Sequence, residues 1–222
     1  MKEMDKLDYK KEYKDIYLPK TKPMTIQVPK MSYIMVEGKG NPNEEEGEYK
    51  NSISILYALS FTIKMSKMGS RKIDGYFDYV VPPLEGLWWI PDLKGIDYNR
   101  KKDFHFISMI RQPEFVTKEI FEWACKEVRE KKQIDVCKAK FQEIEEGLCV
   151  QMMHLGPYDN EPQTIEKIEK YIKENKLVNA IDSKTKDGFI RRHHEIYLSD
   201  PRKAKPENLK TVIRVPVIKK EK

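Results

Sequence analysis

The chain is poor in cysteine. Its 222 residues include only Cys125, Cys137 and Cys149, which lie far apart with no CxxC pair. Disulfide frameworks and zinc sites both depend on paired cysteines at regular spacing, so the sequence predicts neither. Unpaired thiols are typical of a reducing compartment, and we expect a cytoplasmic protein with Cys149 as a small core residue.

Motifs that hold a metal or a cofactor are also lacking. Neighbouring strand residues point to opposite faces, so two adjacent histidines would diverge from any common ion. No Gly-rich phosphate loop, Walker pattern or Ser-His-Asp motif is found. We therefore expect no metal and no cofactor. The four histidines are His105, His154, His193 and His194. No two of them have the spacing of metal ligands together with a third ligand.

Long apolar runs and concentrated charge are absent as well. No run approaches the roughly 20 residues of a membrane-spanning helix. The first residues, Met1–Asp5, mix acids and bases without the apolar segment of a secretory signal. The net charge of +6 is spread over interleaved lysines and glutamates, unlike the basic stripe of nucleic-acid-binding proteins. We expect no membrane association.

The hydrophobic pattern predicts an α+β fold in which one order of elements occurs twice. Each unit is strand, helix, strand, strand, and a helix over residues 117–132 with Thr117 as N-cap joins them. Two such units, about 25–115 and 140–218, would leave a concave cleft between their sheets. Residues 1–24 form an arm laid against this domain. The expected strands are 25–40, 76–81, the segment at Trp88–Trp89, 104–113, 141–155, 193–198 and 211–217, and the helices within the units begin near Glu48 and Pro162.

The strand from His193 to Leu198 carries the first candidate site residue. Period-two alternation places His193, Glu195 and Tyr197 on one face, and Asp200-Pro201 ends the strand. Burying an unpaired charge is costly. Glu195 therefore either faces solvent or has a partner. Tyr197 lines the cleft or supports the carboxylate, and His193 is placed to shift the pKa of Glu195.

The remaining candidates are aromatic. Tyr158 can hydrogen-bond a ligand or position water, or it simply packs on the start of the following helix. Trp88 and Trp89 are adjacent, so in a strand they point to opposite faces and only one lines a cleft. Trp123 lies at the flank of its helix's apolar stripe. For each tryptophan, core packing is the competing interpretation.

Several of these segments resemble a known family. They are Gly156-Pro157-Tyr158, the run Glu195-Ile196-Tyr197-Leu198-Ser199-Asp200-Pro201, and Thr211–Val217. Together they resemble the GyrI-like small-molecule-binding domain, the effector-binding module of many multidrug-responsive bacterial activators, over roughly residues 25–218. The resemblance implies two β-α-β-β halves related by a pseudo-twofold axis. It also implies an aromatic-lined cleft with a glutamate that matches Glu195.

The resemblance implies a function in two forms. In drug-sensing members the glutamate meets cationic aromatic ligands. The Trp-Trp pair and Tyr158 resemble a stand-alone subgroup, some of whose members hydrolyse cyclopropane-bearing DNA-alkylating toxins. Glu195 would then activate water, Tyr158 would polarise the ligand, and the tryptophans would hold its apolar or cationic aromatic body.

A second hypothesis is a module that binds a macromolecule such as a topoisomerase. A drug-sized pocket at Glu195 would favour the small-molecule function, and a filled or shallow groove would favour the interaction function. The arm at residues 1–24 is too short and too interrupted by Pro19 and Pro23 for a helix-turn-helix. We therefore expect no direct DNA binding.

Overall fold

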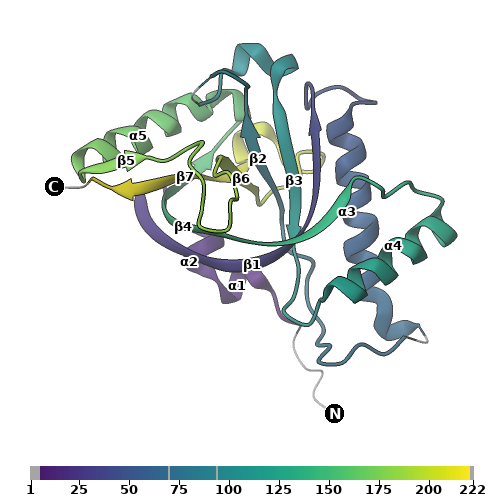
Figure 1. Ribbon diagram of the computed structural model, residues 1–222. Coiled ribbons are helices and arrows are strands. Elements are labelled where there is room, and N and C mark those ends of the chain that lie inside the picture. Colours follow the sequence, from purple (N-terminus) through teal and green to yellow (C-terminus); the bar gives the residue numbers. More distant parts are fainter. Residues whose placement is uncertain (1–5, 70, 94, 221–222) are drawn as a thin grey trace.

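The strands form one antiparallel sheet that closes on itself (Figure 1). The structure is a computed structural model that describes residues 6–69, 71–93 and 95–220. The strand order is β4-β1-β3-β2-β6-β7-β5, and the additional pairing of β4 with β7 makes a barrel of all but β5. The strands are β1 (Met24–Lys39), β2 (Leu84–Trp89), β3 (His105–Arg111), β4 (Ala139–Leu155), β5 (Leu177–Asn179), β6 (His193–Tyr197) and β7 (Lys210–Lys219).

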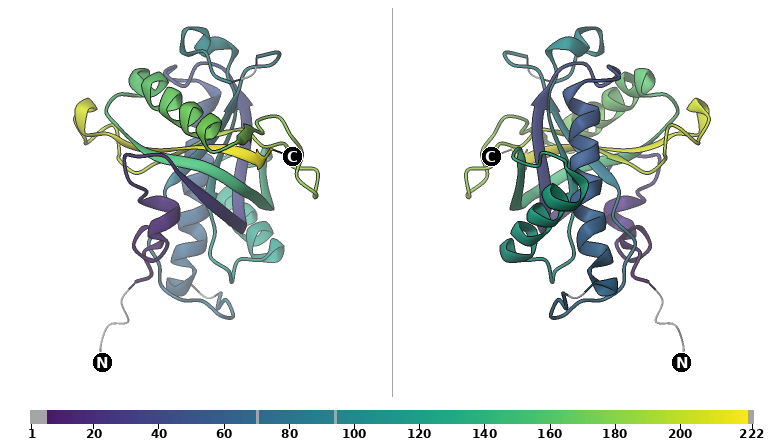
Figure 2. Two further views of the ribbon diagram at one scale, coloured as in Figure 1. Left: turned by 90° about the vertical axis from the view of Figure 1, so that its left-hand side faces the viewer. Right: turned by 90° about the vertical axis from the view of Figure 1, so that its right-hand side faces the viewer.

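Three long helices cover the outside of the barrel. Figure 1 shows α5 on one side and the contacting pair α3 and α4 on the other. In both views of Figure 2, α1 and α2 lie lower than α5. The α-helices are α1 (Tyr9–Glu12), α2 (Lys14–Tyr17), α3 (Glu48–Lys64), α4 (Lys118–Lys132) and α5 (Glu161–Glu174). The 3-10 helices are η1 (Met65–Met68), η2 (Tyr98–Asp103), η3 (Tyr158–Asn160) and η4 (Pro206–Asn208).

The barrel has two equivalent halves, which confirms the predicted α+β architecture. The first is β1-α3-β2-β3 and the second is β4-α5-β6-β7, with α4 between them. In each half the third strand lies between the first and the second. The halves meet where β2 pairs with β6 and where β1 pairs with β4. At each of these two junctions a strand pairs with its counterpart in the other half. A pseudo-twofold axis produces this arrangement.

The predicted strand over residues 76–81 is wrong. Only Tyr79 in this segment pairs, through an isolated bridge to Leu7. The rings of Tyr76, Phe77 and Tyr79 instead pack on Phe115 with centroids 5.1 to 5.9 Å away. Pro82-Pro83 follows, and because proline cannot donate to a ladder, pairing starts only after it, at Leu84. The second strand of the first half is therefore β2.

Alternation along each strand separates the interior of the barrel from its outer face. The interior holds an apolar cluster that includes Met35, Leu87 and Ile196. The outer face of β1 and β3 packs against α3 and α4, and that of β4 and β7 packs against α5. In α4, Thr117 accepts a hydrogen bond from Ile120 N, which confirms the predicted N-cap.

The short helices α1 and α2 lie against the barrel and add side chains to its interior. Tyr9, Ile16 and Tyr17 are buried members of the interior cluster. Residues 1–5 of the predicted arm, and the sequence-based prediction that Met1–Asp5 is no secretory signal, lie outside the described residues. Among the helices described, none combines the length and apolarity needed to cross a membrane.

Candidate functional site

The outer face of the β2–β6 seam carries a polar cluster centred on Glu195. Within β6, His193, Glu195 and Tyr197 share this face, as the alternation predicted. Glu195 pairs with Gly86 of β2 in the register of the two strands. A Cβ atom at position 86 would lie 2.6 Å from the indole nitrogen of Trp88. Glycine there lets the Trp88 side chain lie across the strand toward Tyr197.

Three side chains fix the carboxylate of Glu195. The hydroxyl of Tyr197 donates to Oε2 at 2.8 Å, and Nε2 of His193 lies 3.1 Å from Oε1. Trp88 Nε1 in turn donates to the Tyr197 hydroxyl at 2.8 Å. Glu195 is only 7% exposed, so these bonds offset the cost of removing its charge from water.

The start of α5 brings a second carboxyl to the same place. Glu161 is fully buried, and Tyr98 of η2 donates to its Oε2 at 2.6 Å. One oxygen each of Glu161 and Glu195 and a nitrogen of His193 lie within 4.8 Å of one another. Among the residues that the structure describes, Oε1 of Glu161 has no hydrogen-bond partner. The first half contributes Tyr49 of α3, whose ring centroid lies 5.1 Å from that of Trp88.

Tyr158 is placed by the turn between β4 and α5. Gly156 has φ +118°, which favours glycine, and lets the chain leave β4 sharply. His154 of β4 holds the turn, because its ring nitrogens lie 3.0 Å from Pro157 O and 2.8 Å from Thr164 Oγ1. The Tyr158 ring then packs edge to face on Tyr197 with centroids 5.9 Å apart.

Burial and mutual repulsion keep protons on this cluster. Burial first, and then the charge of Glu195, raises the pKa of Glu161 well above its ordinary value. The same two causes raise the pKa of Tyr158 to about 12 and also raise the pKa of Tyr197 well above its ordinary value. These shifts favour the protonated form of Glu161, and both tyrosines keep their hydroxyl protons as hydrogen-bond donors at neutral pH.

The structure brings five of the seven predicted site residues together: Glu195, Tyr197, His193, Tyr158 and Trp88. Sequence reasoning missed Glu161, Tyr98 and Tyr49. A weak signal existed for Glu161, which precedes Pro162 at the expected helix start, three residues after Tyr158.

The other two tryptophans lie elsewhere. Trp123 packs at the edge of the α3–α4 cluster with the guanidinium of Arg71 5.1 Å from its ring centroid. Trp89 packs on His105, carries Arg192 over its ring, and lines a separate surface hollow of about 760 Å³. Glu195 is not among the residues that line this hollow. Half-buried tyrosine rings enclose Glu195 instead, and these are Tyr49, Tyr98, Tyr158 and Tyr197.

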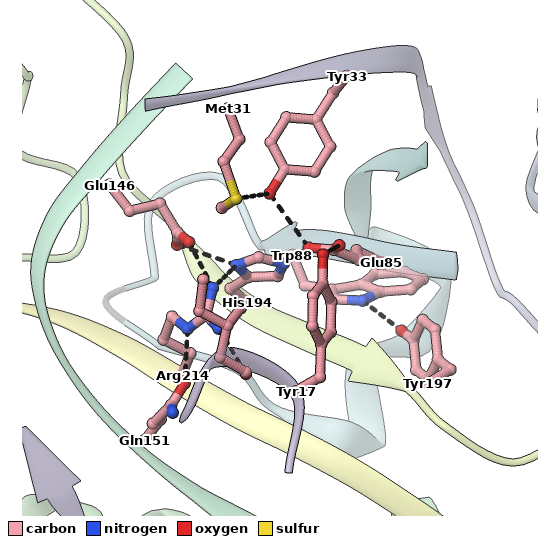
Figure 3. A network of polar contacts seen from close by, with 11 residues as sticks. Tyr17, Met31, Tyr33, Glu85, Trp88, Glu146, Gln151, His194, Tyr197 and Arg214 are labelled. Carbon is pink, nitrogen blue, oxygen red and sulfur yellow. Dashed lines mark hydrogen bonds and ion pairs between the residues drawn. The ribbon is translucent and has the colours of Figure 1, made fainter. Parts of the chain in front are cut away.

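A second charged cluster lies on the inner face of the same strands (Figure 3). His194 lies between two carboxylates, with Nδ1 2.9 Å from Glu146 and Nε2 3.0 Å from Glu85. Arg214 Nη1 donates to Glu146 at 2.8 Å, and its other nitrogens reach Gln151 and the carbonyl of Ile16. Burial opposes charge on His194, but the contacts with Glu146 and Glu85 together outweigh burial and raise the pKa of His194. This cluster is internally paired and ties the N-terminal segment to the barrel.

The family of the chain follows from comparison with known proteins. The model of the GyrI-like small molecule binding domain matches residues 21–218. The chain therefore belongs to the GyrI-like small-molecule-binding family, in agreement with the barrel of two equivalent halves.

Solved structures from Listeria innocua are similar over the whole fold. A protein described as a hydrolase is 46% identical with a TM-score of 0.84, and the match covers 96% of this chain and all (100%) of that one. An uncharacterized conserved protein is 47% identical with a TM-score of 0.86 and the same coverage. The C-terminal domain of EcmrR, at 13% identity and TM-score 0.52 over 89% of this chain and 98% of that one, shares the fold. No match was found among curated proteins.

Proposed function

We propose that this protein binds planar apolar or cationic aromatic small molecules at Glu195 and hydrolyses those that carry a strained cyclopropane ring. The observation that carries the proposal is the buried Glu195 carboxylate, fixed by Tyr197 and His193 and enclosed by aromatic rings. A carboxylate among aromatic faces suits a planar cation through charge and cation–π attraction. In the structure the Tyr158 ring packs on Tyr197 beside the buried Glu195, and a filled groove by itself favours the interaction function. Small-molecule binding therefore requires Tyr158 and its neighbouring rings to move aside.

The chemistry is the addition of water. Glu195 takes a proton from a water molecule whose oxygen attacks a ring carbon of the cyclopropane. The carbon–carbon bond breaks, and its electron pair moves to the conjugated carbonyl oxygen. The phenol of Tyr158, a donor up to a pKa of about 12, hydrogen-bonds the developing oxyanion. The oxyanion then takes a proton from solvent, and Glu195 returns its proton to solvent.

Two similarities support this proposal. The family is one of small-molecule-binding domains. The relative described as a hydrolase is 46% identical, and the match covers 96% of this chain. Because a general base contributes about 10²- to 10⁴-fold to a rate, loss of Glu195 has a measurable consequence.

The test uses Glu195→Gln and the matched control Glu166→Gln, which removes a carboxyl from the exposed face of α5. A spirocyclopropyl dienone is the substrate, because ring opening to a phenol changes its absorption. We expect Glu195→Gln to lower the turnover rate at least 100-fold and to weaken binding of rhodamine 6G, while Glu166→Gln changes neither. Full activity of Glu195→Gln would exclude this residue as the base. A wild-type protein that neither binds the dye nor opens the ring would favour the macromolecular interaction module instead.

A further inference from the structure

Glu161 and Glu195 face each other in a site that is closed to water. Their nearest oxygens are within 4.8 Å, and neither residue is more than 7% exposed. Two carboxylates at this separation repel strongly when buried, so one of them keeps a proton. Glu161 holds it, because Glu195 already accepts the Tyr197 hydroxyl and contacts His193, whereas one oxygen of Glu161 has no partner among the described residues.

The titratable groups around Glu161 come from every neighbouring element. Lys101 forms an ion pair at 2.6 Å with Asp159, which follows Tyr158 in η3. The groups facing Glu161 are Glu195, His193 and Tyr197 of β6, Tyr98 of η2, Tyr158 and Asp159 of η3, and Tyr49 of α3 by way of Tyr197. Within this described set, the acidic groups outnumber the basic ones. A cationic ligand that enters the site can therefore take the place of the proton on Glu161, because its positive charge balances the second carboxylate.

We propose that Glu161 and Glu195 form a carboxyl pair that exchanges its single proton for a cationic aromatic ligand, so that Glu161 sets the charge preference of the site. This inference rests on the proposed binding of such ligands at Glu195. A neutral planar ligand binds with the proton retained. A monocation binds with the proton released from Glu161 to solvent, which leaves two carboxylates beside the ligand. The same site then accepts both ligand types.

An organic cation fits these residues better than a metal ion. Oxygens of both carboxylates are already taken by the hydroxyls of Tyr98 and Tyr197. Hard divalent cations require about six oxygen ligands or retained waters, whereas the surroundings here are the rings of Tyr49, Trp88 and Tyr158. Aromatic faces stabilise an organic cation directly.

The experiment is calorimetric titration of the wild type and Glu161→Gln with rhodamine 6G in buffers of different ionisation enthalpy. We expect release of about one proton per dye bound to the wild type, and an affinity that rises up to tenfold per pH unit. Glu161→Gln should release none and lose this pH dependence, and Glu166→Gln should match the wild type. A neutral planar ligand should release no proton from any variant.

A second measurement separates the failure of this inference from the failure of the proposed function. Infrared spectra at neutral pH should show the band of a buried protonated carboxyl, absent from Glu161→Gln. Dye binding without proton release, or no such band, would overturn the carboxyl pair while Glu195 remains a ligand-binding residue. Absence of dye binding would reject both proposals. Titration with Mn²⁺ tests the metal alternative. If Mn²⁺ binds tightly to the wild type, excludes the dye and no longer binds to Glu161→Gln, the site is a metal site and the inference is overturned.

Discussion

His194 and Glu195 are consecutive residues of β6, yet their side chains belong to separate polar clusters on opposite faces of the barrel wall. His194 contacts Glu146 and Glu85 in the interior. Glu195 accepts the hydroxyl of Tyr197 on the outer face. The interior cluster holds the N-terminal segment in place, and the outer cluster is the candidate binding site. Substitutions in the interior cluster should therefore change stability, and substitutions in the outer cluster should change ligand binding.

The interior cluster makes stability depend on acid pH through Glu146. Burial alone would raise the pKa of Glu146, but the charges of His194 and Arg214 outweigh burial and lower it from 4.5 to about 2. A lowered pKa contributes stability that is complete above the unfolded value of about 4.5 and is lost as the pH falls through 2. From the difference of the two pKa values, we expect a loss of roughly 3 kcal/mol in the free energy of unfolding.

Urea denaturation of Glu146→Gln between pH 2 and 7 checks this dependence. At pH 6 the variant should be about 3–5 kcal/mol less stable than the wild type, because His194 and Arg214 lose their partner. The difference should shrink toward pH 2. Glu143→Gln is the control on the same strand, since its side chain is 55% exposed, and it should stay within about 0.5 kcal/mol. An unchanged gap at pH 2 would contradict the assignment.

Arg214 should control how firmly the N-terminal segment is docked. Its guanidinium is fully buried and reaches Glu146, Gln151 and the carbonyl of Ile16 at once. Lysine has a single ammonium group and cannot reproduce this planar set of bonds. In Arg214→Lys we expect faster hydrogen exchange over residues 9–17, which form α1 and α2, before the barrel opens. Arg202→Lys, at a side chain that is 86% exposed, should exchange like the wild type.

Tyr197→Phe should affect stability and activity together. The change removes the hydroxyl that donates to Glu195 and accepts from Trp88 Nε1. A buried indole N–H left without its acceptor costs about 1–3 kcal/mol, and the freed carboxylate loses its fixed orientation. We expect a lower melting temperature and slower ring opening. Tyr171→Phe, which removes a hydroxyl from the half-buried flank of α5, is the control. Normal activity in Tyr197→Phe would show that this bond does not orient the base.

Trp123→Ala should lower stability without changing ligand affinity. Trp123 packs on the α3–α4 cluster under Arg71, apart from the Glu195 cluster. Because the ring is only half-buried, we expect a loss of about 1–3 kcal/mol, less than for a fully buried tryptophan. Thermal unfolding and dye titration of the same variant separate the two effects. A tenfold loss of affinity in the folded variant would place Trp123 in the binding site after all.

Much of the fold and part of the site follow from local sequence patterns. Extended backbone alternates side chains between two faces, so the run from His193 to Tyr197 predicts that Glu195, His193 and Tyr197 lie together. The same rule separates Trp88 from Trp89. Repetition of the strand, helix, strand, strand order predicts two halves, since each unit needs the other to bury its apolar face.

Closure of the barrel decided what the sequence could not. Which of the two tryptophans faces Glu195 depends on the pairing of β2 with β6, and the failure of residues 76–81 to form a strand depends on their contact with Phe115. The approach of Glu161 to Glu195 depends on how α5 packs across the sheet. Alternation is a property of a few consecutive residues, whereas these contacts join segments that are remote in the chain, and only the packed barrel sets the distance between them.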